Sequence, residues 1–98
     1  MPDMPAESIT LAQSIHRRDD VVFQEVGGEA VLLDLASETY FGLNPVGTRI
    51  WQLIGAGARL QAIRDTLVAE YDADAERIGS DLLALATQLR ASGLVRID

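Results

Sequence analysis

The stretch LDLASETYFGLNPVGTRIW, residues 33–51, decides the fold because its hydrophobic period changes part-way along. The run TYFGL at 39–43 predicts a short strand, since β-branched and aromatic residues favour extended structure. Asn44 and Pro45 then predict the start of a helix. An Asn side chain accepts a hydrogen bond from free backbone amides, and Pro suits the first helical position. A strand that leads directly into a helix indicates a fold with both a sheet and helices.

Two runs before this stretch predict a β-hairpin. Residues 21–26 (VVFQEV) are rich in β-branched and aromatic side chains. Gly27-Gly28 predicts a two-residue turn, because the central residues of such turns have positive φ angles. Residues 30–35 (AVLLDL) predict the returning strand and, being apolar on both faces, the central one. With 39–43 they form a three-stranded antiparallel meander whose third strand lies at an edge.

The second half of the chain predicts three helices from the spacing of its apolar residues. They run from 45 to 54, from about 59 to 70 and from about 75 to 92, and Gly93 predicts the last C-cap. Residues 94–97 are expected to fold back as a short apolar tail. The fold class is therefore α+β, a three-stranded antiparallel sheet followed by three helices. This order also describes a winged helix-turn-helix domain.

The N-terminal region is less regular. Residues 1–8 are Pro-rich and polar and predict a flexible tail, which leaves 9–98 as a single domain. Residues 9–15 (ITLAQSI) fit either a short edge strand or an irregular lead-in. Residues 16–20 (HRRDD) predict a charged turn.

Composition excludes several functions. The 98 residues carry 15 Asp and Glu against 8 basic residues, all Arg, for a net charge of −7. This charge disfavours nucleic acid and anionic membranes, because both need a basic surface. The chain has no Cys and shows no signal peptide or membrane span, so we expect a cytoplasmic protein.

No group of residues indicates catalysis. His16 is the single histidine and is expected to be solvated in a charged turn. Asp72, Asp74 and Glu76 could hold a hard cation, but an acidic helix start is favourable without any ion. We therefore expect no catalytic residue, no metal site and no cofactor, and a binding module is favoured.

The strand at 39–43 is the candidate binding element. An edge strand exposes unpaired N–H and C=O groups, and this one has neither a charge nor a Pro to protect it. Such an edge is either covered by another element or used to add a partner's strand. Gly42 would allow a partner backbone to approach closely. Some of the three aromatic residues Tyr40, Phe41 and Trp51 are expected in the core, because a small core needs large side chains.

The order and spacing of several motifs resemble the PqqD family. They are Leu33-Asp34-Leu35, Tyr40-Phe41-Gly42-Leu43-Asn44 with Gly47 and Ile50-Trp51, Tyr71-Asp72, Asp81-Leu82, Leu85, Leu89 and Gly93-Leu94-Val95. Members are the pyrroloquinoline-quinone biosynthesis peptide chaperone and the RiPP recognition elements. The YFGLN-x-x-G-x-x-IW form is more similar to stand-alone recognition proteins of lasso-peptide clusters than to the quinone-pathway chaperone.

The resemblance implies a non-catalytic adaptor that binds the leader of a ribosomally synthesised precursor peptide. The leader would add as an antiparallel strand to the third strand, with side chains in a cleft beside the third helix. A modifying enzyme, such as a leader peptidase, cyclase or radical SAM enzyme, would then act on the precursor. The implied binding residues are Thr39, Tyr40, Phe41, Gly42 and Leu43 on the strand and Asp81, Ala84, Leu85 and Gln88 on the helix. Leu82 and Leu89 are expected in the core, and Leu85 fits either role.

Three other functions stay open at this point. One is a pyrroloquinoline-quinone chaperone acting with a radical SAM enzyme, and another is an enzyme subunit without a site of its own. The third is a winged-helix DNA-binding regulator, which the mixed charge of 75–92 disfavours. One departure from the family is Ala58-Arg59, where a Thr-like residue often caps the second helix, so we expect a weak cap there.

Overall fold

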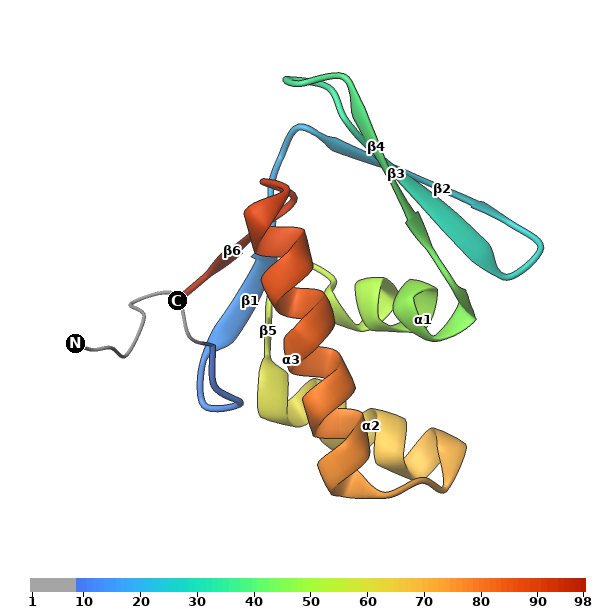
Figure 1. Ribbon diagram of the computed structural model, residues 1–98, viewed down its shortest axis with the longest axis vertical. Helices are drawn as coiled ribbons and strands as arrows, with labels where there is room; N and C mark the ends of the chain where they lie inside the picture. The colour runs from blue at the N-terminus through green and yellow to red at the C-terminus, as the bar shows by residue number, and fades with distance from the viewer. Residues whose placement is uncertain (1–8) are drawn as a thin grey trace.

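The computed structural model describes residues 9–98, and the tail expected at 1–8 lies outside them. The α+β class is confirmed, with three helices and two antiparallel sheets (Figure 1). The elements in chain order are β1 (Ser14–Arg17), β2 (Val21–Val26), β3 (Glu29–Asp34), β4 (Thr39–Leu43), α1 (Pro45–Ile54), β5 (Ala58–Arg59), α2 (Leu60–Tyr71), α3 (Ala75–Ala91) and β6 (Val95–Ile97).

The expected meander is confirmed as the sheet β2-β3-β4, with β3 in the centre and β4 at an edge. Gly27 and Gly28 have φ angles of 63° and 86°, as a two-residue hairpin turn requires. The turn pairs Val26 with Glu29, so β3 begins one residue earlier than predicted. The chain then returns along β4 in register, from Asp34 opposite Thr39 to Ala30 opposite Leu43.

A second sheet, in the order β5-β1-β6, was not predicted. Residues 16–17, expected in a charged turn, belong to β1, and the apolar tail forms β6. Ala58 and Arg59 form β5, so α2 starts at residue 60. The predicted order of one sheet followed by three helices is therefore wrong, because strands also stand before, between and after those elements. The winged-helix likeness stays a prediction.

Helix starts follow the capping residues. The Asn44 side chain accepts a bond of 2.7 Å from the Gly47 N–H at the start of α1. Asp74 accepts from the Glu76 N–H at 3.3 Å at the start of α3, which confirms the capping role expected for this acidic segment. Gly93, with φ of 75°, ends α3 as expected.

The start of α2 is satisfied by distant backbone. Arg59 supplies no side-chain cap, in line with the weak cap predicted from the sequence. Instead, the Leu60 N–H donates to the Gln13 carbonyl at 2.9 Å and the Gln61 N–H to the Leu11 carbonyl at 3.0 Å. The segment before β1 thus pairs the free amides that every helix start presents.

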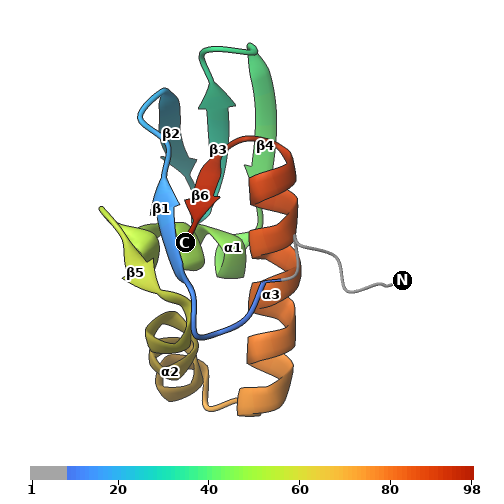
Figure 2. The same cartoon turned by 90° about the vertical axis from the view of Figure 1, so that its left-hand side faces the viewer.

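One hydrophobic core joins the sheets and helices. Trp51, Leu82 and Leu89 are buried in it, which confirms the core role expected for the two leucines. The Arg17 guanidinium stacks over the Trp51 ring at 4.8 Å from its centroid and donates to the Trp51 carbonyl, which connects β1 to α1. Burial lowers the pKa of Arg17. Figure 2 shows α3 beside the β2-β3-β4 sheet and α1 below it.

Candidate functional site

The outer edge of β4 is open. β4 pairs with β3 on one side, and among residues 9–98 no strand pairs with its other side. A sheet edge of this kind offers a row of backbone donors and acceptors to a further strand. The edge expected from the sequence is therefore present and uncovered by any described strand.

The hairpin turn decides which backbone groups face this edge. In a two-residue hairpin, the residues flanking the turn form a hydrogen-bonded pair, and such pairs alternate along antiparallel strands. Counting from the Val26–Glu29 pair, the odd-numbered residues of β3 bond to β2 and its even-numbered residues bond to β4. The even-numbered residues of β3 lie opposite 39, 41 and 43. The N–H and C=O of Tyr40 and Gly42 consequently point away from β3, to the free edge.

A cleft of about 370 Å³ lies beside this edge. It is formed by β4, the first turns of α1 and the middle of α3. Its lining residues are Phe41, Gly42, Leu43, Asn44, Val46, Gly47, Ile50, Asp81, Leu85 and Gln88. The structure thus brings together six of the nine residues implied by the family resemblance.

The other three implied residues lie outside the cleft. The Tyr40 side chain is 75 % exposed on the opposite face of the sheet, because successive strand residues point to opposite faces. Thr39 is exposed, and its hydroxyl lies 2.7 Å from that of Ser37. Ala84 is exposed on α3. Of these three, Tyr40 still contributes its backbone to the edge.

Leu85 lies where both roles that the sequence left open are possible. It is half-buried, packs against the core and lines the cleft. Asp81 and Gln88 are exposed and lie about one turn on either side of it. The α3 wall is therefore an apolar centre between a carboxylate and an amide.

The sequence reasoning missed the floor of the cleft, which α1 supplies. Val46 and Ile50 are four residues apart and therefore lie on one face of the helix. Gly47 sits between them, and a Cβ there would lie 3.2 Å from the Leu43 side chain and 3.3 Å from the Asn44 side chain. The small residue lets α1 start close against β4. The Val-x-x-x-Ile spacing directly after the strand was the available signal.

The cleft carries few charged groups among its described lining residues. Asp81 supplies the carboxylate among the described lining residues. No group of three metal-ligating side chains occurs within 9–98. His16, expected to be solvated, is instead half-buried in β1, with its Nε2 3.0 Å from an Asp98 carboxylate oxygen. It lies on the other sheet and takes no part in the cleft.

A family model identifies this arrangement. Residues 29–95 match the model described as coenzyme PQQ synthesis protein D (PqqD), and this range holds the whole lining of the cleft. The chain belongs to the PqqD family. The family expected from the sequence motifs is thus confirmed.

Two solved structures are similar to this PqqD-family chain. TbiB1 in complex with the TbiA(beta) leader peptide is 38% identical, with a TM-score of 0.78, over 83% of this chain and 94% of that chain. A lasso peptide synthetase B1 complexed with the leader peptide is 25% identical, with a TM-score of 0.68, over 84% of this chain and 96% of that chain. A comparison with curated proteins finds no match. In the described part of the chain, no helix has the length and apolar character needed to cross a bilayer.

Proposed function

We propose that this PqqD-family chain is a non-catalytic adaptor that binds the leader of a ribosomally synthesised precursor peptide. The leader adds to β4 as an antiparallel strand. One observation carries the proposal: the open edge at Tyr40 and Gly42 borders a cleft. The chain has 38% sequence identity to one solved with a leader peptide.

Binding divides between backbone and side chains. The N–H and C=O of Tyr40 and Gly42 fix the register of the leader by main-chain hydrogen bonds. Every second leader side chain then enters the cleft, since strand residues alternate between faces. Val46, Ile50 and Leu85 favour apolar side chains there. On the α3 side of the cleft, the Asp81 carboxylate can accept a hydrogen bond from a basic or hydroxyl group of the leader.

The adaptor presents its bound peptide to a modifying enzyme such as a leader peptidase or cyclase. Holding the precursor on the enzyme's partner raises the local concentration of substrate. We place this function in the cytoplasm, where ribosomes make the precursor. The likeness to lasso peptide synthetase B1 favours a lasso-type precursor.

A second candidate is the chaperone role in pyrroloquinoline-quinone synthesis, acting with a radical SAM enzyme. The description of the matching family favours it. Both candidates use the same edge and differ in the leader. Titration with each class of leader separates them, because specificity is a difference between two affinities.

The proposal is tested by NMR titration of the isotope-labelled chain with the leader encoded beside its gene. We expect chemical-shift changes at 39–43 and along the cleft side of α3, and slower hydrogen exchange of the Gly42 amide once it is bonded. A leader that leaves these amides unchanged, or that shifts residues of β5-β1-β6 instead, contradicts strand addition at β4.

A further inference from the structure

The outer face of the β2-β3-β4 sheet is apolar, and no element within residues 9–98 covers it. Val22 and Val31 are each 45 % exposed there, and Tyr40 is 75 % exposed. On the inner face, by contrast, Ala30 and Leu32 are buried in the core. β3 was predicted to be apolar on both faces, and the structure shows that one of those faces meets solvent.

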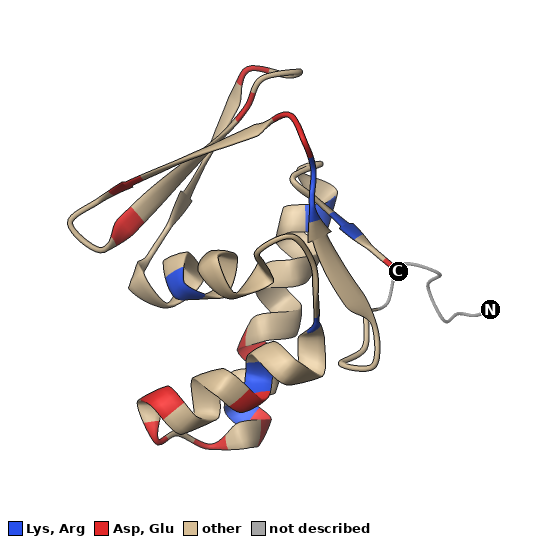
Figure 3. Ribbon diagram, turned by 180° about the vertical axis from the view of Figure 1, so that it is seen from behind, with Lys and Arg blue, Asp and Glu red and all other residues tan. Residues whose placement is uncertain are grey.

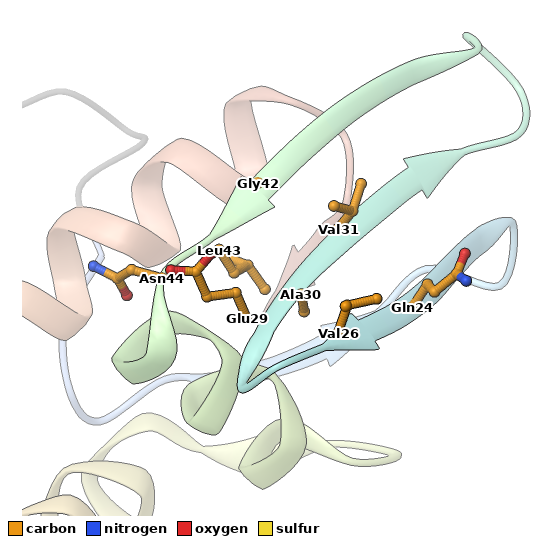
Figure 4. Close-up of a pocket in the computed structure, with 8 residues that line it drawn as sticks. All are labelled: Gln24, Val26, Glu29, Ala30, Val31, Gly42, Leu43 and Asn44. Atoms are coloured by element: carbon orange, nitrogen blue, oxygen red, sulfur yellow. The ribbon is translucent and has the colours of Figure 1, made fainter.

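This outer face is hollowed next to β4. A depression of about 750 Å³ is lined by Gln24, Val26, Glu29, Ala30, Val31, Gly42, Leu43 and Asn44 (Figure 4). Gly42 has no side chain, and an added Cβ would meet nothing within 4 Å. The depression therefore continues across β4 to the free edge. The outer face and the edge proposed for the leader form one continuous surface.

The acidic residues around this face indicate the kind of partner that could bind it. No Lys or Arg stands between Arg18 and Arg49 in the sequence. By strand register Glu29 lies on the outer face, and Asp19, Asp20 and Glu38 lie in the turns before β2 and before β4. Glu25 and the buried Asp34 belong to the inner face and do not contribute to this surface. Figure 3 shows red and no blue along β2, β3 and β4. A second copy of the chain would bring like charges together, which is unfavourable. A partner with an apolar centre and a rim of Lys and Arg is complementary.

The position proposed for the leader reduces the number of candidate partners further. A leader on β4 lies at the border of the outer face, within reach of any protein seated there. The enzyme that must contact the leader itself, rather than the rest of the precursor, is the one that cleaves it. We infer that the outer face, centred on Val22 and Val31, docks the leader peptidase through a basic-rimmed apolar surface. This inference rests on the proposed function.

The test uses two single variants, Val22→Lys and Val31→Lys, in the full chain. Each places a cation against the apolar centre of the partner, where it would lose its hydration without an opposite charge to pair with, and neither residue belongs to β4 or to the cleft. Ala69→Lys adds the same charge at an exposed position on α2 and serves as the matched control. The probe is the purified leader peptidase encoded with the precursor, titrated by calorimetry into the leader-bound chain.

We expect both face variants to weaken peptidase binding by about tenfold or more. Their affinity for the leader alone should stay within about twofold of the unmodified chain, as should both affinities of Ala69→Lys. Circular dichroism verifies that each variant is folded before titration.

Four results overturn the inference or the proposal beneath it. Unchanged peptidase affinity in both face variants refutes the docking surface while leader binding stands. A parallel loss of leader affinity assigns the face to the leader instead. Sedimentation of the unmodified chain as a dimer, with Val31→Lys a monomer, assigns it to a second copy. Failure of the unmodified chain to bind any leader refutes the proposed function itself.

Discussion

Replacing Gly42 by Pro tests strand addition with little disturbance of the sheet. The Gly42 N–H faces the free edge, so its loss breaks no hydrogen bond to β3. Proline is tolerated on edge strands when its missing N–H faces solvent, and the preceding residue is already extended. The folded chain should therefore keep β4, while the leader loses one donor at the middle of the binding strand.

The expected loss of affinity follows from that single donor. A leader carbonyl left without a partner in the complex costs about 1–3 kcal/mol. At about 1.4 kcal/mol per factor of ten, leader binding should weaken by about 5- to 150-fold. Contact between the proline ring and the leader backbone acts in the same direction.

The assay is fluorescence anisotropy of a labelled leader titrated with each variant. Gly42→Ala is the matched control, because it keeps the N–H and its Cβ meets nothing within 4 Å. Thermal melts followed by circular dichroism establish that both variants fold. If folded Gly42→Pro binds the leader as tightly as Gly42→Ala, the backbone of β4 does not hold the leader and the assignment of its free groups is wrong.

Three further predictions address the cleft, the second sheet and a surface ion pair. Leu85→Ala should lower leader affinity by about 3- to 10-fold, since it removes the apolar centre of the α3 wall; anisotropy measures this, and no change would exclude Leu85 from the binding surface. Gly57→Ala should destabilise the fold by about 1–3 kcal/mol, because φ is 154° there and the new Cβ would lie 2.5 Å from His16 Nδ1; urea unfolding that matches the unmodified chain would contradict this. The Arg49 guanidinium bonds to Glu70 at 2.6 and 2.9 Å and lowers the pKa of that carboxyl. The stabilisation is therefore present above the ordinary Glu pKa and is lost as pH falls through the lowered value; an NMR titration in which Arg49→Gln leaves the Glu70 pKa unchanged would exclude this cause.

The parts of the fold that the sequence predicted are those with strong local signals. Gly27-Gly28 decides a turn type, and Asn44-Pro45 starts a helix by local bonding, so the meander and α1 were predicted almost to the residue. The β5-β1-β6 sheet has no such signal. Its strands are two to four residues long and come from three distant parts of the chain. Their pairing depends on tertiary packing, which a hydrophobic period of two cannot reveal over so few residues.

The candidate site shows the same division. Residue types at 39–43 predicted an exposed edge, because the absence of charge and Pro is visible in the sequence. The floor supplied by Val46 and Ile50 was missed, since apolar residues at helical spacing fit the core equally well. The α1 side of the cleft becomes visible once the helix is placed directly against β4.

The different fates of Tyr40 and Phe41 follow from register. Both are aromatic neighbours on one strand, and composition alone cannot say which of them faces the cleft. The two-residue turn at 27–28 determines which residues of β3 bond to β2 and which bond to β4. The pairing of Leu33 with Tyr40 and of Leu32 with Phe41 then determines which residues of β4 bond to β3 and which face the free edge. Phe41 therefore joins the cleft, while Tyr40 directs its backbone to the edge and its side chain to the outer face. A shift of one residue in this pairing would exchange the two aromatics and turn the N–H of Gly42 inward. The turn glycines do not line the cleft, yet they determine which β4 amides face the free edge.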